Sequence, residues 1–267
     1  MMKLSVITVT FNAEETLERT LKSVQEQTYP DLEHLIVDGA SRDGTGELVH
    51  KYAKGKGNGQ EGEVTAERKA NAEEKMSSHT QLRWVSEPDR GLYDAMNKAI
   101  GMASGDYLCF LNAGDTFHSP DTVEKMMHSL DTNQPPDILY GETAIVDDRG
   151  TFLHMRRLQA PEKLNWKSFK QGMLVCHQAF IVKRELAEPY DLSYRFSSDF
   201  DWCIRMMKKA TSIHNTRLTL INYLNEGTTT ANRKASLKER YRIMAKYYGQ
   251  ISTFSHHVWF VIRTVLK

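Results

Sequence analysis

Carboxylate side chains gather in the stretch WVSEPDRGLYDAMNKAIGMASGDYLCFLNAGDTF, which covers residues 84–117. Glu87, Asp89, Asp94 and Asp115 lie there beside two apolar runs that are typical of buried strands. Carboxylates in this setting can bind a polyanionic ligand through a metal ion, because Mg²⁺ and Mn²⁺ prefer hard oxygen ligands. The plainer alternative is that they are solvated residues at the ends of loops.

Strands and helices alternate along most of the chain. The β-branched run LSVITVTFN is of strand length, and Leu17, Leu21 and Val24 then recur at helical spacing. This rhythm predicts a parallel sheet with helices on its faces, and the last two strands are expected to form a mixed or antiparallel extension. The predicted strands cover residues 4–12, 32–39, 82–88, 106–115, 137–147 and 152–158. The predicted helices cover 13–27, 44–53 after a turn at 41–43, 91–103, 119–130, 197–210 and 234–267.

Two helix starts carry capping signals. Asn12 is a good N-cap, and Glu15 follows three residues later, as in a capping box. Ser119 is expected to cap the helix that follows the fourth strand, with Pro120 at the first helical position. Both signals place a helix directly after a strand or turn.

The composition narrows the class of protein. A chain of 267 residues suffices for one large domain, or for a domain with an appendage. The formal net charge of +1 gives no overall attraction to nucleic acid. Cys109, Cys176 and Cys203 are far apart and odd in number, which argues against a disulfide framework. Because no secretory signal is apparent and no apolar run approaches the roughly 20 residues of a membrane span, we expect a cytoplasmic protein.

Residues 54–81 interrupt the strand and helix rhythm. The stretch is polar, rich in glycine and charge, and poor in large apolar residues, so we expect an exposed insertion with a helix at about 64–77. Its GKGNG lacks the GK[ST] ending and the preceding strand of a phosphate-binding loop. We expect a main domain at residues 1–225 that contains this insertion, and a helical extension at 226–267.

Polar residues follow four of the predicted strands at their carboxyl ends. In a parallel α/β sheet, ligands bind outside these ends, so all four segments are expected on one rim. No GxGxxG follows the first strand, which argues against a dinucleotide-binding fold. The four segments are Thr10–Asn12, Asp38–Asp43, Glu87–Asp94 and Asn112–Asp115.

Five blocks stand in a characteristic order: SVITVTFN (5–12), VDGASRDGT (37–45), SEPDRGLYDAMNKAI (86–100), GDYLCFLNAGD (105–115) and SSDFDW (197–202). Together they resemble the family 2 inverting glycosyltransferases with the GT-A fold. The block at 86–100 is most similar to members that build bacterial capsular polysaccharide, exopolysaccharide of the colanic-acid type, or lipopolysaccharide. The resemblance implies an α/β fold with a single, mostly parallel central sheet flanked by helices, followed by a C-terminal helical extension.

The resemblance also implies a donor site for a nucleotide sugar along the rim. Asp38 matches the aspartate that accepts a hydrogen bond from an N–H of the nucleotide base. The backbone near Thr10 and Phe11 would line the base pocket. Alternatively, Asp38 caps the following helix, a role that Ser41 or Asp43 could also fill.

Other residues match positions around the ribose and the phosphates. They include Asp89, Asn97 and Lys98, although Lys98 could equally lie on a solvated helix face. The further residues expected to bind the donor are Asn12, Ser41, Asp43, Glu87, Asp94, Asn112, Ala113 and Gly114.

The sequence NAGD stands where the family has its metal-binding DxD. Its first position is Asn112, which leaves Asp115 as the anionic residue of the motif and the expected ligand of Mg²⁺ or Mn²⁺. One carboxylate can suffice, because phosphates and water complete the shell of these ions. The metal would neutralise the leaving nucleoside diphosphate. As an alternative, Asp115 is an ordinary turn residue.

An inverting transfer needs a base on the face of the sugar opposite the leaving group. Asp199 aligns with the family's catalytic position, where many members have Glu-Asp, and the preceding residue here is Ser198. Asp201 is the second candidate. Both aspartates could instead favour the positive end of the following helix.

Three further residues are candidates near the acceptor or the diphosphate. His177 and Gln178 recur in similar sequences, although a lone histidine among apolar residues is more often structural. Trp202 could stack on a sugar face or belong to the core.

The C-terminal region is basic and amphipathic. Such a helix can lie on an anionic membrane at about 1 kcal/mol per well-placed basic residue, or pack on the main domain with a solvated basic face. The end of the chain, HHVWFVIRTVL, could insert shallowly or mediate a contact between two copies. The basic residues of this region are Arg233, Lys234, Lys238, Arg240, Arg242 and Lys246.

The leading hypothesis is a hexosyltransferase-type enzyme that moves a sugar from a nucleotide donor to a glycan or lipid-linked acceptor. A sugar-nucleotide nucleotidyltransferase is disfavoured, because TVTFNAEE has no glycine-rich loop ending in Arg or Lys. The third hypothesis is a catalytically degenerate nucleotide-sugar-binding or scaffold protein. Its support is that Asn112 and Ser198 depart from the residues that the family has at these positions.

Overall fold

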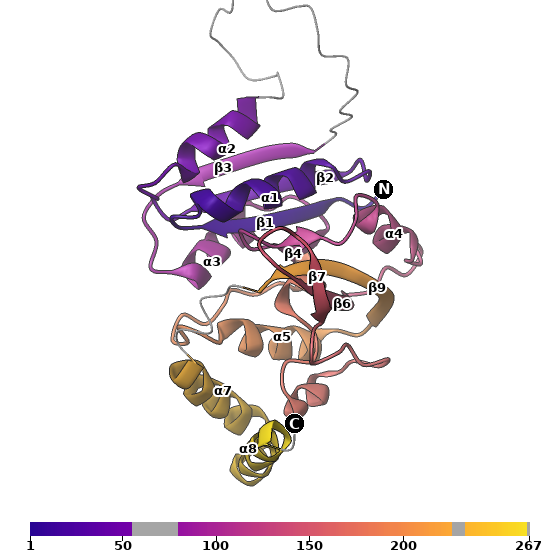
Figure 1. The fold of residues 1–267 in the computed structure, drawn as a ribbon. Coiled ribbons are helices and arrows are strands. Elements are labelled where there is room, and N and C mark those ends of the chain that lie inside the picture. The colour runs from indigo at the N-terminus through magenta and orange to yellow at the C-terminus, as the bar shows by residue number, and fades with distance from the viewer. Residues whose placement is uncertain (55–79, 226–232, 266–267) are drawn as a thin grey trace, which may run out of the picture.

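The computed structural model describes residues 1–54, 80–225 and 233–265. Its strands form one sheet in the order β3-β2-β1-β4-β8-β6-β9-β5, with β7 paired to β6 (Figure 1). The predicted helix at 64–77 and most of the predicted insertion at 54–81 lie outside the described residues. The predicted domain boundary between residues 225 and 226 lies at the edge of the second gap. The strands are β1 (Leu4–Thr10), β2 (Leu32–Asp38), β3 (Gln81–Ser86), β4 (Tyr107–Phe110), β5 (Thr116–Phe117), β6 (Ile138–Val146), β7 (Phe152–Met155), β8 (Phe180–Lys183) and β9 (Ile213–Leu224).

The first half of the sheet is parallel, as the sequence predicts. β1 pairs in parallel with β2 and with β4, and β2 pairs in parallel with β3. Every residue of β1, β2 and β4 is buried, which agrees with their nearly continuous apolar sequences. The helices that connect these strands are α1 (Glu14–Gln25), α2 (Thr45–Lys54) and α3 (Leu92–Met102).

Helices cover both faces of this parallel half. On one face, Ile36 of β2 packs with Leu17 of α1 and Val49 of α2. On the other face, Leu35 and Val37 belong to the larger core that contains α3. The alternation follows from the pleat of β2, whose successive side chains point to opposite faces.

Beyond β4 the pairing changes. β8 is antiparallel to both β4 and β6, while β9 runs parallel to β6 and antiparallel to β5. Neither β8 nor β9 was predicted, whereas β6 and β7 were, and they form an antiparallel hairpin. The other helices among the described residues are α4 (Thr122–His128), α5 (Ser198–Lys209), α7 (Arg233–Tyr248) and α8 (Gln250–Val265), with the 3₁₀ turns η1 (Trp166–Gln171), η2 (His177–Ala179) and η3 (Arg184–Leu186).

The helix starts differ from the predicted caps. Asn12 lies at φ 51° ahead of Ala13, which is the residue that precedes α1, so Asn12 is no N-cap. Its Oδ1 accepts instead from the backbone N–H of Arg42. The fourth helix begins at Thr122, so Ser119 and Pro120 lie before the helix, although Ser119 still contacts its first residue.

Candidate active site

Three neighbouring strands bring Thr10, Asp38 and Ser86 together. The parallel register pairs Thr10 with Asp38 and Asp38 with Ser86, at the carboxyl ends of β1, β2 and β3. Thr10 and Ser86 both donate their hydroxyl hydrogens to the Asp38 carboxylate, at 2.9 Å and 2.7 Å. The predicted rim of polar strand ends therefore exists in this part of the sheet.

Asp38 is buried and its acceptor positions are taken. Ser41 donates to it through both its backbone N–H and its hydroxyl, in addition to the two strand residues. Burial raises the pKa of Asp38, but the hydrogen bonds from Ser41, Ser86 and Thr10 outweigh burial, so the pKa is lowered. A carboxylate offers about four lone-pair sites, so a nucleotide base could reach Asp38 only by replacing one of these donors.

Phe11 and Asp89 meet over Gly39 beside this cluster. A Cβ atom at Gly39 would lie 2.5 Å from Asp89 Oδ2 and 3.3 Å from Phe11 Cδ2, so glycine is needed for the close approach. Asp89 accepts from the backbone N–H of Gly91 at 2.7 Å. The Phe11 ring is 66% exposed, which is unusual for an aromatic side chain at the end of a buried strand.

Several predicted donor residues have structural partners. Asp43 accepts from the backbone N–H groups of Glu14 and Thr45, the first residues of α1 and α2, and it therefore caps both helices. Asn97 exchanges two hydrogen bonds with the backbone of Tyr190. Asp94 accepts from the backbone and the guanidinium of Arg90.

Lys98 lies on the rim rather than free on a helix face. Its ammonium group is 2.8 Å from Glu87 Oε1 and donates to the carbonyl of Pro88 at 2.8 Å. Glu87 is exposed, and its backbone N–H donates to the carbonyl of Asp38. Both side chains therefore remain at the edge of the predicted donor site.

Asp115 is held in a tight turn after β4. Gly114, at φ 99°, allows the turn, and a Cβ there would meet Leu224 Cδ2 at 2.9 Å. The carboxylate accepts from Gln178 Nε2 at 2.8 Å and from the backbone N–H of Leu224 at 3.0 Å. Burial raises the pKa of Asp115 to about 7, since these two hydrogen bonds only partly offset the loss of solvent.

The oxygen Oδ1 of Asn112 is buried and finds no hydrogen-bond donor among the described residues. The same turn thus holds one orphaned oxygen and one buried carboxylate with no cationic side chain in ion-pair contact within the described ranges. Hard oxygen donors of this kind suit Mg²⁺ or Mn²⁺. In the described ranges no cluster of three His, Cys, Asp or Glu side chains could hold a metal, so a diphosphate and water would have to supply the other ligands. Ala113, between the two, packs beside the smaller core cluster.

Asp199 lies in the first turn of α5 and is partly exposed. Its Oδ1 accepts from the hydroxyl of Tyr93 at 3.1 Å and from the backbone N–H of Phe200 at 2.9 Å. Within the described parts of the chain, no hydrogen bond to Oδ2 is formed. Asp199 therefore has one oxygen fixed by the protein and one oxygen available to accept a proton.

Asp201, the second candidate base, is in a different environment. It is fully buried and accepts from Arg205 Nε at 2.7 Å, from Lys246 Nζ at 3.1 Å and from the hydroxyl of Tyr247 at 2.8 Å. Two cations compensate its charge, and two of its three partners come from α7. The geometry favours a structural role for Asp201, which ties α5 to α7.

His177 and Trp202 belong to an aromatic cluster around Tyr190. Trp202 is fully buried, stacks on Tyr190 with ring centroids 4.9 Å apart, and donates to the carbonyl of Glu188. It therefore offers no face to a sugar. His177 is hydrogen-bonded through Nε2 to the Tyr190 hydroxyl at 2.7 Å, and burial lowers its pKa to about 4, so its ring is neutral near pH 7.

Asp115 and Asp199 are joined by this cluster. Gln178, which binds Asp115, follows His177; His177 binds Tyr190, and Tyr190 stacks on Tyr93, the partner of Asp199, at 5.5 Å. Burial, followed by the negative charges of both aspartates among other groups, raises the pKa of Tyr223. The contacts through Gln178, His177, Tyr190 and Tyr93 therefore connect the two carboxylates.

Tyr93 and Tyr190 contact the candidate site residues and were not predicted from the sequence. Neither tyrosine is among the residues that the sequence assigns to the site. A tyrosine within the SEPDRGLYDAMNK block was the available signal, because buried tyrosine hydroxyls usually find an acceptor.

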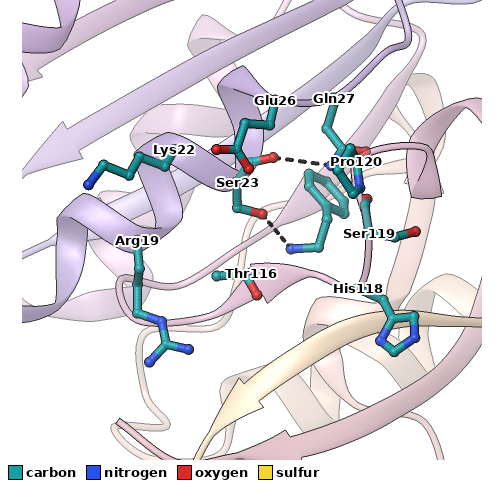
Figure 2. Close-up of a pocket in the computed structure, with 10 residues that line it drawn as sticks. Arg19, Lys22, Ser23, Glu26, Gln27, Thr116, His118, Ser119 and Pro120 are labelled. Atoms are coloured by element: carbon teal, nitrogen blue, oxygen red, sulfur yellow. Dashed lines mark hydrogen bonds between the residues drawn. The ribbon is translucent and has the colours of Figure 1, made fainter. Parts of the chain in front are cut away.

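Two hollows on the described surface adjoin these residues in the chain but are not lined by them. One, of about 320 Å³, lies between α1 and the segment that contains β5, and its walls include Arg19, Ser23 and His118 (Figure 2). Ser23 and Gln27 are linked there by a hydrogen bond, and Ser23 also accepts from the backbone of Phe117. The other hollow is lined by residues of α1 and α2. Neither contains a predicted site residue.

The family model described as glycosyl transferase family 2 matches residues 5–190. The chain belongs to this family. It is 33% identical over 206 residues to the uncharacterized glycosyltransferase Rv1514c of Mycobacterium tuberculosis. This alignment covers 75% of the present chain and 67% of Rv1514c. It is also 25% identical over 237 residues to a putative teichuronic acid biosynthesis glycosyltransferase, TuaG, of Bacillus subtilis. This second alignment covers 88% of the present chain and 84% of TuaG.

Solved structures confirm the GT-A fold. Residues 1–349 of TarS from S. aureus, in complex with UDP-GlcNAc, align with a TM-score of 0.65 at 19% identity, over 91% of this chain and 64% of that chain. The mannosyltransferase PcManGT from Pyrobaculum calidifontis, in complex with GDP-Man and Mn²⁺, aligns with a TM-score of 0.59 at 17% identity. The alignment covers 96% of the present chain and 74% of the mannosyltransferase chain. The family model and the relatives confirm the predicted family, and the solved structures confirm the predicted fold.

Proposed function

We propose that the chain is an inverting glycosyltransferase of the hexosyltransferase type, which transfers a sugar from a nucleoside-diphosphate donor to a glycan or lipid-linked acceptor in bacterial surface polysaccharide synthesis. The main support for the proposal is that the Asp115 and Asp199 carboxylates, which one chain of contacts connects, have different environments. Asp115 is buried in the turn that also holds the orphaned oxygen of Asn112, and Asp199 is partly exposed with one free oxygen. The name of the Bacillus relative, for teichuronic acid synthesis, supports the acceptor class.

The donor would lie along the carboxyl ends of β1, β2 and β4. The exposed Phe11 ring can cover the face of a nucleotide base, and a base N–H can replace the Ser41 hydroxyl on Asp38. Asp89, beside Phe11, is placed to accept from ribose hydroxyls, and Lys98 at the same rim carries a positive charge for the phosphates. The solved neighbours bound to UDP-GlcNAc and to GDP-Man support a donor of this class.

Asn112 and Asp115 would hold a Mg²⁺ or Mn²⁺ ion together with the donor diphosphate. Bound there, the ion would offset the negative charge of the departing nucleoside diphosphate. The protein's own contribution is to keep both oxygens in place: Gln178 and the backbone of Leu224 orient the Asp115 carboxylate, and Thr20 accepts from the backbone N–H of Gly114. The Mn²⁺ in the complex of the mannosyltransferase supports this assignment.

Asp199 would act as the general base. Its free Oδ2 takes the proton of an acceptor hydroxyl while that oxygen forms a bond to the anomeric carbon and the bond to the diphosphate oxygen breaks. The electron pair of the broken bond leaves with the nucleoside diphosphate. A carboxylate at this point also stabilises the oxocarbenium-like charge of the transition state. Attack opposite the leaving group inverts the anomeric configuration.

A donor screen tests the proposal. Thermal stability of the purified chain would be followed with UDP-, GDP-, CMP- and dTDP-sugars, each with and without Mn²⁺, alongside Asp115→Asn and Asp199→Asn. We expect metal-dependent stabilisation by one nucleotide family, lost in Asp115→Asn and retained in Asp199→Asn. If no nucleotide sugar stabilises the chain, a scaffold function becomes the better account.

A further inference from the structure

Large exposed apolar side chains concentrate on one face of α8. Ile251, Phe254, Val258, Trp259 and Ile262 are between 42% and 86% exposed. Their spacing of three, four, one and three residues places them along one side of a helix. Such a continuous exposed apolar stripe marks an interaction surface, because isolated exposed residues are common but aligned ones are not.

The opposite face of α8 holds the helix onto the rest of the chain. Thr253 is fully buried there, and Phe260 packs against the main core. The His257 ring contacts Tyr241 of α7, with centroids 5.0 Å apart. The apolar stripe is therefore a second, outward face of a helix that is already packed, and not the interior side of a helix awaiting its own core.

Exposed positive charge lies on the neighbouring helix. Lys234, Lys238 and Arg242 of α7 are exposed and recur every four residues, which aligns them on one side of that helix. Glu239 is turned toward the chain, where it accepts from the backbone N–H groups of Arg195 and Phe196. Between residues 250 and 262, α8 has no Lys, Arg, Asp or Glu.

We propose that the α7 and α8 pair docks on an anionic lipid surface, with the apolar stripe of α8 lying in the interface and the basic stripe of α7 near the headgroups. α7 and α8 lie together at the end of the molecule opposite α2 and β3 (Figure 1). No helix among the described residues is long and apolar enough to cross a membrane, so the contact is one of surface insertion. The surface goes beyond the proposed reaction, since none of these residues belongs to the candidate site.

Vesicle flotation of the full chain tests the docking surface. Binding would be compared between vesicles of phosphatidylcholine alone and vesicles that also contain phosphatidylglycerol. We expect binding to the anionic vesicles, weakened by salt, and lowered about tenfold or more in the variant Phe254→Gln, Val258→Gln, Trp259→Gln. The variant Lys234→Gln, Lys238→Gln, Arg242→Gln should lose the preference for anionic lipid. Lys246 is left unchanged because it binds Asp201.

Matched controls separate docking from general surface effects. Phe152→Gln removes an aromatic side chain of similar exposure on β7, and Lys51→Gln, Lys125→Gln, Arg149→Gln removes three exposed charges elsewhere. Both controls should bind vesicles like the parent chain. Equal binding to both vesicle types, or binding that the α8 variant retains, would overturn the proposal. So would a dimer, seen by light scattering, that the α8 variant abolishes without any vesicle binding by the parent chain.

Discussion

The hydroxyl of Tyr93 donates a hydrogen bond to Asp199 Oδ1 across 3.1 Å, between residues 106 positions apart in the chain. It joins the first turn of α3 to the first turn of α5. Burial raises the pKa of Tyr93, so the hydroxyl remains a donor throughout the neutral range. Tyr93 thus fixes one oxygen of the proposed base and leaves the other for the acceptor.

Replacing Tyr93 tests this positioning. Tyr93→Phe retains the ring that stacks on Tyr190 and removes the hydrogen bond. We expect kcat to fall about tenfold, the value of a hydrogen bond worth about 1.4 kcal/mol, with the KM for the donor unchanged. Tyr52→Phe is the matched control, because the Tyr52 hydroxyl donates to Glu18 at 2.9 Å, between α1 and α2. A Tyr93→Phe enzyme with parental kcat would contradict the positioning role.

The two aspartates of α5 should differ in what their loss affects. Asp199→Asn is expected to lower kcat by about 10²- to 10⁴-fold, the usual contribution of general base catalysis, with little change in stability. Asp201→Asn is expected to destabilise the fold by about 3 kcal/mol, because it leaves Arg205 and Lys246 without their shared carboxylate. Steady-state kinetics and urea unfolding measure the two effects. The reverse pattern would make Asp201 the base.

The metal assignment can be tested by adding charge. Asn112→Asp places a second carboxylate in the turn that holds Asp115, so we expect Mn²⁺ to bind about tenfold more tightly in the presence of donor nucleotide. The same change should lower the stability of the metal-free chain through repulsion between the two carboxylates. Thermal stability as a function of Mn²⁺ concentration reports both. Asn133→Asp, in an exposed loop, is the control, and equal Mn²⁺ affinity in the two variants would count against this site.

Glu33, near the start of β2 and away from the candidate site, should control acid stability. Burial alone would raise its pKa, but hydrogen bonds from Ser5, Ser104 and Lys3 outweigh burial and lower the pKa from 4.5 to about 2. A carboxylate whose pKa is lowered by folding stabilises the fold above its unfolded pKa, and this stability is lost as the pH falls toward the folded value.

Glu33→Gln should therefore be less stable than the parent chain at pH 7, and the difference should shrink as the pH falls from about 4.5 to about 2. Thermal unfolding over this pH range is the measurement. A difference that stays constant with pH would mean that the variant disturbs packing and that the carboxylate charge contributes nothing.

The parallel half of the sheet was predictable because its strands are short apolar runs separated by helices of clear periodicity. β9 was not, because IHNTRLTLINYL mixes polar and apolar residues, contains Arg217 at φ 57°, and shifts its register against β6. β8 has only four residues, and its pairing with β4 and β6 depends on segments distant in sequence. Long-range pairing of this kind leaves little local signal.

The candidate site was predictable in its residue types, and less so in their roles. Asp199 and Asp201 lie two positions apart at a helix start, and the packing of α7 decides which one is neutralised. Asp43 and Asn97 are polar residues in the expected segments, but they bind backbone groups that no sequence pattern reveals. The orphaned oxygen of Asn112 likewise depends on how the turn after β4 is buried.

The anomeric configuration of the released sugar distinguishes an inverting from a retaining transfer, and its measurement requires no knowledge of the acceptor. The donor found in the screen would be incubated with Mn²⁺ in the absence of acceptor, so that water attacks the anomeric carbon in its place. Proton NMR would identify the first sugar released, before mutarotation mixes the anomers. We expect the β-anomer from an α-linked donor, and we expect its release to be lost in Asp199→Asn. The α-anomer as the first product would contradict an inverting transfer with Asp199 as its base.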